Sequence, residues 1–200
     1  LSYASYDFGD IDNDGDFDFL ISGYSFDGFK TILFENQRKV DENGVVVQPL
    51  QVSYVEKAND FVSVKKGTAD FVDFDADGKL DVLISGQSSS GDLVKAYKND
   101  TGSFSDMNVG LPAVREGRFV FGDFDSNGYK DVVYSGTVSG QGKITKMATW
   151  KTDTSTMVSS EDDYDLSYYE DANIGIADFD NDKDADLVIT GKNKFITDYN

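Results

Sequence analysis

A nine-residue acidic segment occurs four times in this chain, and its spacing constrains the fold more than any other feature. The copies cover residues 10–18, 73–81, 123–131 and 178–186, so their starting points lie 63, 50 and 55 residues apart. Each copy has Asp at positions 1, 3 and 9, and each is followed by three apolar or aromatic residues and a Ser-Gly or Thr-Gly pair. Four copies in register indicate an array of repeated structural units.

The flanks of each acidic segment predict strands. A large apolar residue stands two positions before each first Asp, and a second residue that is mostly apolar stands four positions before it. This period of two is typical of a strand with one buried face. The apolar runs at 19–21, 82–84, 132–134 and 187–189 are typical of strands buried on both faces, and the following glycine marks a turn. Each acidic segment is therefore predicted to be a loop that joins two antiparallel strands.

Further strands complete each unit. A third strand is predicted at 31–36 and at 94–99, and both segments end in aromatic-x-Asn. The third copy is predicted at 146–151, where Trp150 is matched to Phe34 and Tyr97. A looser fourth copy is predicted at 195–200. Fourth strands are predicted within 45–57, 103–114 and 156–169, and an inserted hairpin within 37–48. Units of this length with four strands are typical of propeller blades. The sequence thus predicts an all-β chain, with approximate blades at 1–61, 62–115, 116–170 and an incomplete 171–200.

The acidic loops have the residue pattern of a cation site. Calcium takes six to eight oxygen ligands at about 2.3–2.6 Å, and alternate residues of a tight loop can turn carboxylates to one centre. Gly at position 6 permits the positive φ that such a loop needs, and position 7 can offer a backbone carbonyl. We therefore expect up to four Ca²⁺, one per loop. The candidate ligands are Asp10, Asp12, Asp14, Asp16, Asp18, Asp73, Asp75, Asp77, Lys79, Asp81, Asp123, Asp125, Asn127, Tyr129, Asp131, Asp178, Asp180, Asp182, Asp184 and Asp186.

Two other interpretations of the loops compete with this one. An EF-hand needs Glu at position 12 and flanking helices, but position 12 is Ile or Tyr in all four copies. Alternatively, the loops are solvated hairpin turns that aid solubility. Against this, they hold 17 of the 37 acidic residues, which repel one another unless a cation lies among them. Asn127 removes one ligand charge from the third loop, and Lys183 replaces the glycine of the fourth, so the four sites are not expected to be equal.

The composition excludes several classes of function. Lys and Arg number 18 against 37 Asp and Glu, and a net charge of −19 argues against nucleic-acid and membrane-surface partners. The absence of Cys and His leaves this chain alone without a disulfide, a Cys/His zinc site or a His-based triad. No apolar stretch approaches the length that spans a bilayer, and the N-terminus lacks the pattern of a signal peptide.

The motifs resemble FG-GAP/VCBS repeats, the blades of integrin-α-type β-propellers. The resemblance rests on Phe8-Gly9-Asp10, Phe121-Gly122-Asp123 and the run from Gly78 to Gly86, and residues 102–136 resemble the bacterial version. It implies calcium loops on one face of the propeller and ligand contacts on the opposite face, here residues 24–30, 87–92 and 137–143 with linkers near 58–67 and 113–118. Seven blades are usual in the family, so the chain is either a four-bladed ring or part of a larger propeller, of which we favour the second.

These observations predict a non-enzymatic, calcium-stabilised adhesion or ligand-recognition module that is secreted or displayed on a cell surface and is of bacterial type. Its expected partner is a protein or glycan, or further blades of the same polypeptide. Tyr24, Phe26 and Phe29 either form an exposed contact for that ligand or fold back onto the blade. The alternatives are a propeller domain of a polysaccharide-degrading enzyme and a structural subunit of a bacterial surface or secretion assembly.

Overall fold

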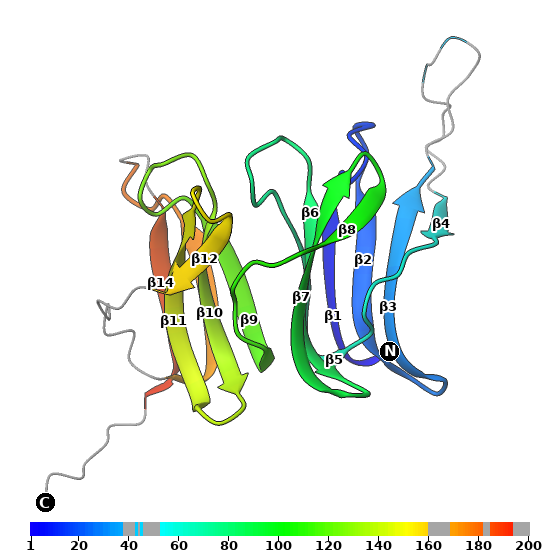
Figure 1. Ribbon diagram of the computed structural model, residues 1–200. Coiled ribbons are helices and arrows are strands. Elements are labelled where there is room, and N and C mark those ends of the chain that lie inside the picture. The colour runs from blue at the N-terminus through cyan, green and yellow to red at the C-terminus, as the bar shows by residue number, and fades with distance from the viewer. Residues whose placement is uncertain (38–42, 44, 46–52, 160–168, 182–184, 194–200) are drawn as a thin grey trace, which may run out of the picture.

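The computed structural model describes residues 1–200 except 38–42, 44, 46–52, 160–168, 182–184 and 194–200 (Figure 1). Its described residues form strands and loops without a helix, so no helical segment is available there to cross a membrane. The all-β prediction is confirmed. The strands are β1 Ser2–Gly9, β2 Asp18–Ser25, β3 Gly28–Asn36, β4 Tyr54–Lys57, β5 Lys65–Val72, β6 Asp81–Ser88, β7 Gly91–Asp100, β8 Ser103–Met107, β9 Val114–Gly122, β10 Asp131–Val138, β11 Gly142–Lys151, β12 Thr156–Ser159, β13 Tyr169–Ala177 and β14 Asp186–Asn193.

Strands that follow one another in the chain pair antiparallel within each sheet, as in propeller blades. β1–β4, β5–β8 and β9–β12 form three four-stranded sheets, and β13–β14 form a two-stranded sheet. The acidic loops join the first and second strands of each sheet, because Gly9 pairs with Asp18 and Val72 pairs with Asp81 across the loop. The prediction that each acidic loop joins two antiparallel strands is therefore confirmed.

Among the described residues, the fourth strands β4, β8 and β12 have four, five and four residues, and they lie within the segments predicted for them. The hairpin predicted within 37–48 and the strand predicted at 195–200 lie largely or wholly outside the described residues.

The register predicted for the third strand of the third sheet is wrong. The turn between β10 and β11 pairs Val138 with Gly142, whereas the matching turn in the second sheet pairs Ser88 with Gly91. This turn is longer by one residue and places Ala148 at the position of Tyr97, whereas the predicted match of Trp150 would have needed three added residues. Trp150 instead packs on the Phe74 ring, with the ring centroids 5.9 Å apart.

The apolar core lies between successive sheets, which stand face to face in a row (Figure 1). We call the side of a sheet turned toward the next sheet its leading face, and the opposite side its trailing face. Ile11, Leu20 and Leu33 come from the leading face of the first sheet. They pack in one cluster with trailing-face residues of the second sheet, namely Ala69, Phe71, Val82, Ile84 and Tyr97. A second cluster joins the second and third sheets in the same way.

The first strand of each sheet contains a β-bulge near its start. Register shifts lie between Ser2 and Ser5, Lys65 and Thr68, Arg115 and Arg118, and Glu170 and Asn173. In the second and third sheets the bulge includes Gly67 and Gly117, where the strand passes very close to its neighbour. The first sheet has Ala4 at this position, and its neighbour lies farther away. A Cβ added at Gly23 would be 3.2 Å from the Cα of Ala4. In the third sheet, a Cβ added at the matched Gly136 would be 2.7 Å from the Cα of Gly117.

Candidate metal centre

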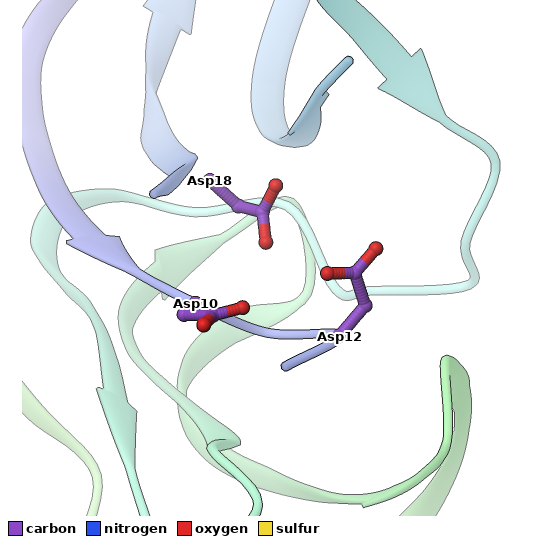
Figure 2. A group of neighbouring side chains, drawn as sticks. All are labelled: Asp10, Asp12 and Asp18. Carbon is purple, nitrogen blue, oxygen red and sulfur yellow. The ribbon is translucent and has the colours of Figure 1, made fainter. Parts of the chain in front are cut away.

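Three aspartates of each acidic loop, at positions 1, 3 and 9, lie together in the structure. In each group, one carboxylate oxygen from every member lies within 4.8 Å of the others. Figure 2 shows the first group, whose side chains come from both ends of the loop. The groups are Asp10, Asp12 and Asp18; Asp73, Asp75 and Asp81; Asp123, Asp125 and Asp131; and Asp178, Asp180 and Asp186.

The aspartate at position 1 organises the loop around its own carboxylate. Asp10 Oδ1 accepts a hydrogen bond from the N–H of Asp14 at 3.0 Å, and Oδ2 accepts one from the N–H of Gly15 at 2.9 Å. Asp73 and Asp123 repeat this pair of contacts in the second and third loops. The loop therefore winds tightly even before any ion is considered, because a side chain replaces the missing backbone acceptors.

Two residues in each of the first three loops are left-handed. Gly15, Gly78 and Gly128 at position 6 have φ of 88°, 83° and 88°, which confirms the role predicted for these glycines. Position 4 is also left-handed, with φ between 56° and 65° at Asn13, Ala76, Ser126 and Asn181. This second position was not predicted from the sequence, although asparagine in two of the four copies is a signal for it. Lys183 at position 6 of the fourth loop lies outside the described residues.

The aspartate at position 9 fastens the loop to the sheet. Asp18 Oδ2 accepts from the N–H of Ile11 inside the loop at 2.8 Å, and Oδ1 accepts from the N–H of Asn36 on β3 at 2.8 Å. Asp81 likewise accepts from the N–H groups of Phe74 and Asn99. Asp131 accepts from those of Phe124 and Trp150. All three side chains are buried. This aspartate therefore has a structural role in addition to any role as a ligand.

Positions 5 and 7 do not join the three-carboxylate groups in the described loops. The side-chain oxygen at position 5 instead accepts a hydrogen bond from the N–H of position 7. The N–H of Asp16 lies 3.0 Å from Asp14, that of Lys79 lies 3.0 Å from Asp77, and that of Tyr129 lies 2.8 Å from Asn127. Asp182 and Asp184 lie outside the described residues. In the first three loops the structure therefore gathers the side chains at positions 1, 3 and 9, and the other two predicted side chains lie outside these groups.

Burial raises the pKa of four aspartates in these groups. It is the main cause for Asp18, Asp81 and Asp131, and it raises the pKa of Asp81 to about 6, while the backbone N–H donors oppose it. Burial also raises the pKa of Asp12, and the neighbouring charge of Asp14 adds to the effect. Gathering carboxylates without a cation therefore disfavours their ionised form, and a bound divalent cation would reverse that preference.

The donor set fits a hard divalent cation. Two oxygens that share an ion at about 2.4 Å lie at most about 4.8 Å apart, and one carboxylate oxygen from each member of a group meets this condition. All three donors are carboxylates, the ligand type that calcium and magnesium prefer. In the second loop, Asp75 Oδ1 is buried and has no hydrogen-bond partner among the described residues, so it is available to a ligand.

A lysine that was not predicted from the sequence reaches into the second loop. Lys98 Nζ on β7 pairs with Asp75 Oδ2 and lies 3.3 Å from Asp77 Oδ2. The position is the x of the aromatic-x-Asn pattern, where the first sheet has Glu35. Because β7 pairs with β6, this residue is held beside the acidic loop, which is the signal that could have identified it. The second loop thus carries its own ammonium group beside its carboxylates.

The aromatic residues of the first hairpin divide into packed and exposed members. Tyr24 and Phe29 pack edge to face, with ring centroids 5.5 Å apart, and Lys65 Nζ lies 4.8 Å and 5.2 Å from their ring centres. Phe26 at the tip is fully exposed. The hairpin lies at the end of β2 opposite the acidic loop. The structure therefore shows folding back for two of these residues and exposure for the third.

A separate polar cavity of about 440 Å³ lies among the first strands of three sheets, lined by Ser5, Thr68, Asp70 and Arg118 among others. The Thr68 hydroxyl donates to Asp70 Oδ2. Burial, with a contribution from the charge of Asp7, raises the pKa of Asp70 to about 7, although Thr68 and Arg118 oppose the shift. The carboxyl group of Asp70 therefore titrates near neutral pH.

This titration predicts a pH dependence of stability. Between about pH 4 and pH 7 the folded chain keeps a proton on Asp70 that the unfolded chain has lost, so stability falls as pH rises through this range and levels off above it. Asp70→Asn keeps the acceptor for Thr68 and removes the charge. In EDTA it is expected to raise the free energy of unfolding by on the order of 2 kcal/mol at pH 8 and to change it little at pH 4. Urea unfolding at both pH values tests this, and an equal effect at both would contradict it.

Comparison with known proteins agrees with this architecture. Residues 73–134, which run from the second acidic loop through β10 as far as Tyr134, match the model of the FG-GAP-like repeat. No curated protein matches this chain in sequence. The matched segment includes two complete acidic loops and part of the apolar cluster between the second and third sheets. Residues 73–134 are thus an FG-GAP-like repeat, and the chain is consistent with an FG-GAP/VCBS repeat protein.

Proposed function

We propose that this chain is a calcium-stabilised, non-enzymatic module for adhesion or ligand recognition in a secreted or cell-surface protein. The observation that carries the proposal is the fourfold recurrence of three carboxylates within 4.8 Å at the same loop positions. An ion in each group would offset the repulsion among these carboxylates and hold both ends of the loop. Sites with dissociation constants of about 10⁻⁴–10⁻³ M are filled at extracellular calcium concentrations.

The proposed recognition surface is the end of the sheets opposite the acidic loops. Phe26 is exposed there, and Tyr24, Phe29 and Lys65 form an ordered aromatic and cationic platform beside it. Aromatic side chains at such sites anchor protein ligands and can also stack on sugars. The proposed ligand is therefore a protein or glycan, which is bound without turnover. FG-GAP repeats occur in extracellular proteins, which agrees with this location.

Calcium addition tests the metal assignment. The melting temperature of the wild-type chain in EDTA is expected to rise by several degrees on addition of 5 mM CaCl₂, because the ion binds the folded loops. Asp12→Ala and Asp75→Ala are each expected to reduce that rise and to remove one site in isothermal titration calorimetry. Asp27→Ala, on the exposed hairpin, is the matched control and should leave both unchanged. Equal calcium responses in all four proteins would refute the assignment.

The second loop is expected to bind calcium more weakly than the first, because the Lys98 ammonium competes for its carboxylates. Lys98→Met removes this competitor and keeps most of the aliphatic chain. It is expected to raise the calcium affinity of the second loop about tenfold, as the repulsion between two nearby cations predicts. Calorimetry on the variant measures this. Lys95→Met on the same strand, whose lysine pairs with Asp106, is the control and should leave the affinity unchanged. An unchanged affinity in Lys98→Met would contradict the prediction.

The recognition function needs its own test. Wild-type protein and Phe26→Ala are compared on a panel of immobilised glycans and extracellular-matrix proteins, with release of reducing sugar measured in parallel. Binding that is weakened by Phe26→Ala, without release of sugar, would support recognition. Release of sugar by the wild-type chain would favour the enzyme alternative, and calcium binding would remain valid in either case.

A further inference from the structure

The third acidic loop has an amide where the other three loops have a carboxylate. Position 5 is Asn127 in this loop, and it is Asp14, Asp77 and Asp182 in the others. Asn127 is followed by Gly128, and both residues are exposed to solvent. The loop that lacks one carboxylate therefore carries an Asn-Gly pair at that place, within reach of water.

An Asn-Gly pair has a characteristic reaction with water. Glycine has no Cβ, so its backbone nitrogen can approach the side-chain Cγ of the preceding asparagine without steric hindrance. When that nitrogen loses its proton to the solvent and attacks Cγ, the N–Cγ bond forms, the Cγ–Nδ2 bond breaks and ammonia leaves. Water then opens the succinimide ring, at Cγ to give aspartate or at the main-chain carbonyl to give isoaspartate. The net change replaces NH₂ by OH and needs no oxidant, and it is one reason why asparagine is thermolabile.

The wound loop holds both reacting groups in hydrogen bonds. The N–H of Gly128, which must lose its proton, donates to Asp123 Oδ2 at 2.8 Å. The side-chain oxygen on Cγ of Asn127 accepts from the N–H of Tyr129 at 2.8 Å. The N–H of Asn127 also donates to Asp123 Oδ1 at 3.0 Å. Ring closure must break these contacts, so the reaction requires the loop to unwind.

We propose that Asn127 is a deamidation site that reacts when the third loop is free of calcium and is protected when the loop holds the ion. The calcium dependence rests on the proposed function, because Asp123 is both a member of the carboxylate group and the acceptor for Gly128. An ion on Asp123, Asp125 and Asp131 stabilises the wound loop and reduces the fraction of chains in which the loop is open.

The two products change the third site in opposite directions. Aspartate at 127 restores the charge that the other loops carry at position 5, so it strengthens the attraction for a divalent cation. Isoaspartate inserts the Cβ atom into the main chain and moves the N–H groups of Gly128 and Tyr129 away from their acceptors, so it weakens the site. Asn127→Asp reproduces the first product, and calorimetry is expected to show severalfold tighter calcium binding at the third loop.

Peptide mapping by mass spectrometry tests the proposal on the 200-residue chain at pH 8, at a temperature where circular dichroism shows that it is folded in EDTA. Aspartate and isoaspartate at 127 are expected to accumulate in EDTA. In 5 mM CaCl₂ the rate should fall about sixfold or more, which is the factor 1 + [Ca²⁺]/Kd for a dissociation constant of about 10⁻³ M or below. Asn127→Gln, which would have to close a larger ring, should stay unmodified at this position.

Three controls separate protection by an ion in this loop from a general effect of calcium. Asn43-Gly44, the other Asn-Gly pair of the chain, lies outside the acidic loops and should react at the same rate in both buffers. Asp125→Ala removes one member of the third carboxylate group, so calcium should no longer protect Asn127. Asp75→Ala makes the same change in the second loop and should leave the protection of Asn127 intact.

The outcomes distinguish this proposal from the proposed function. An Asn127 that stays intact in EDTA while Asn43 reacts would overturn the modification site. Equal rates in both buffers, with calcium binding to the third loop seen by calorimetry, would overturn the protection. Equal rates without any calcium binding would refute the proposed function, and products at 127 would still support the modification site. Protection of Asn127 that is lost in Asp125→Ala and kept in Asp75→Ala supports both.

Discussion

Asp131→Ala is expected to lower the free energy of unfolding by about 3 kcal/mol, and to do so in EDTA as well as in calcium. The substitution removes the acceptor of the N–H groups of Phe124 and Trp150, both at 3.0 Å, and leaves these donors without a partner in a buried site. An orphaned buried donor costs about 1–3 kcal/mol, and relief of the buried carboxylate charge offsets part of that loss. Urea unfolding followed by circular dichroism measures the change.

Asp125→Ala in the same loop is the control for this prediction. Asp125 is exposed and accepts the N–H of Asn127 at 3.2 Å, so its loss in EDTA should cost less than about 1 kcal/mol. In calcium, both variants are expected to lose the additional stabilisation by the ion. If Asp131→Ala were destabilising only in calcium, the aspartate at position 9 would be a ligand without the structural role described above.

Gly67→Ala is expected to destabilise the chain by about 3 kcal/mol or more. A Cβ at this position would lie 1.8 Å from the carbonyl oxygen of Ser85 and 2.5 Å from the Cα of Gly86. Both are backbone atoms of the central strand β6, so they cannot move aside without breaking the pairing of β5 with β6. Thermal and urea unfolding test this prediction.

Gly175→Ala is the matched control, because Gly175 also lies in the first strand of a sheet, but no atom of the described residues lies within 4 Å of the position that an alanine Cβ would take. It should change the free energy of unfolding by less than about 0.5 kcal/mol. If Gly67→Ala were tolerated equally well, the close approach of β5 to β6 would not be a constraint on this residue.

The regular part of the fold could be predicted from the sequence because it is encoded locally. Each acidic loop is bounded by an alternating strand and a continuous apolar run, and both patterns lie within about 20 residues of one another. Gly78 and its counterparts likewise indicate the tight turn, because few other residues take a positive φ at low cost. The register of β11 could not be predicted in this way, because the match of Trp150 to Tyr97 requires three added residues before β11, whereas the turn adds only one.

The sequence alone determined that the chain repeats a strand–acidic loop–strand unit four times, because residue spacing and side-chain chemistry are local properties. Only the tertiary structure decided that Asp18, Asp81 and Asp131 tie the loop to the third strand, and that Lys98 enters the second loop. It also decided which apolar faces are covered by a neighbouring sheet. The physical reason is that these contacts join residues far apart in the chain, and their partners are set by strand pairing and sheet packing.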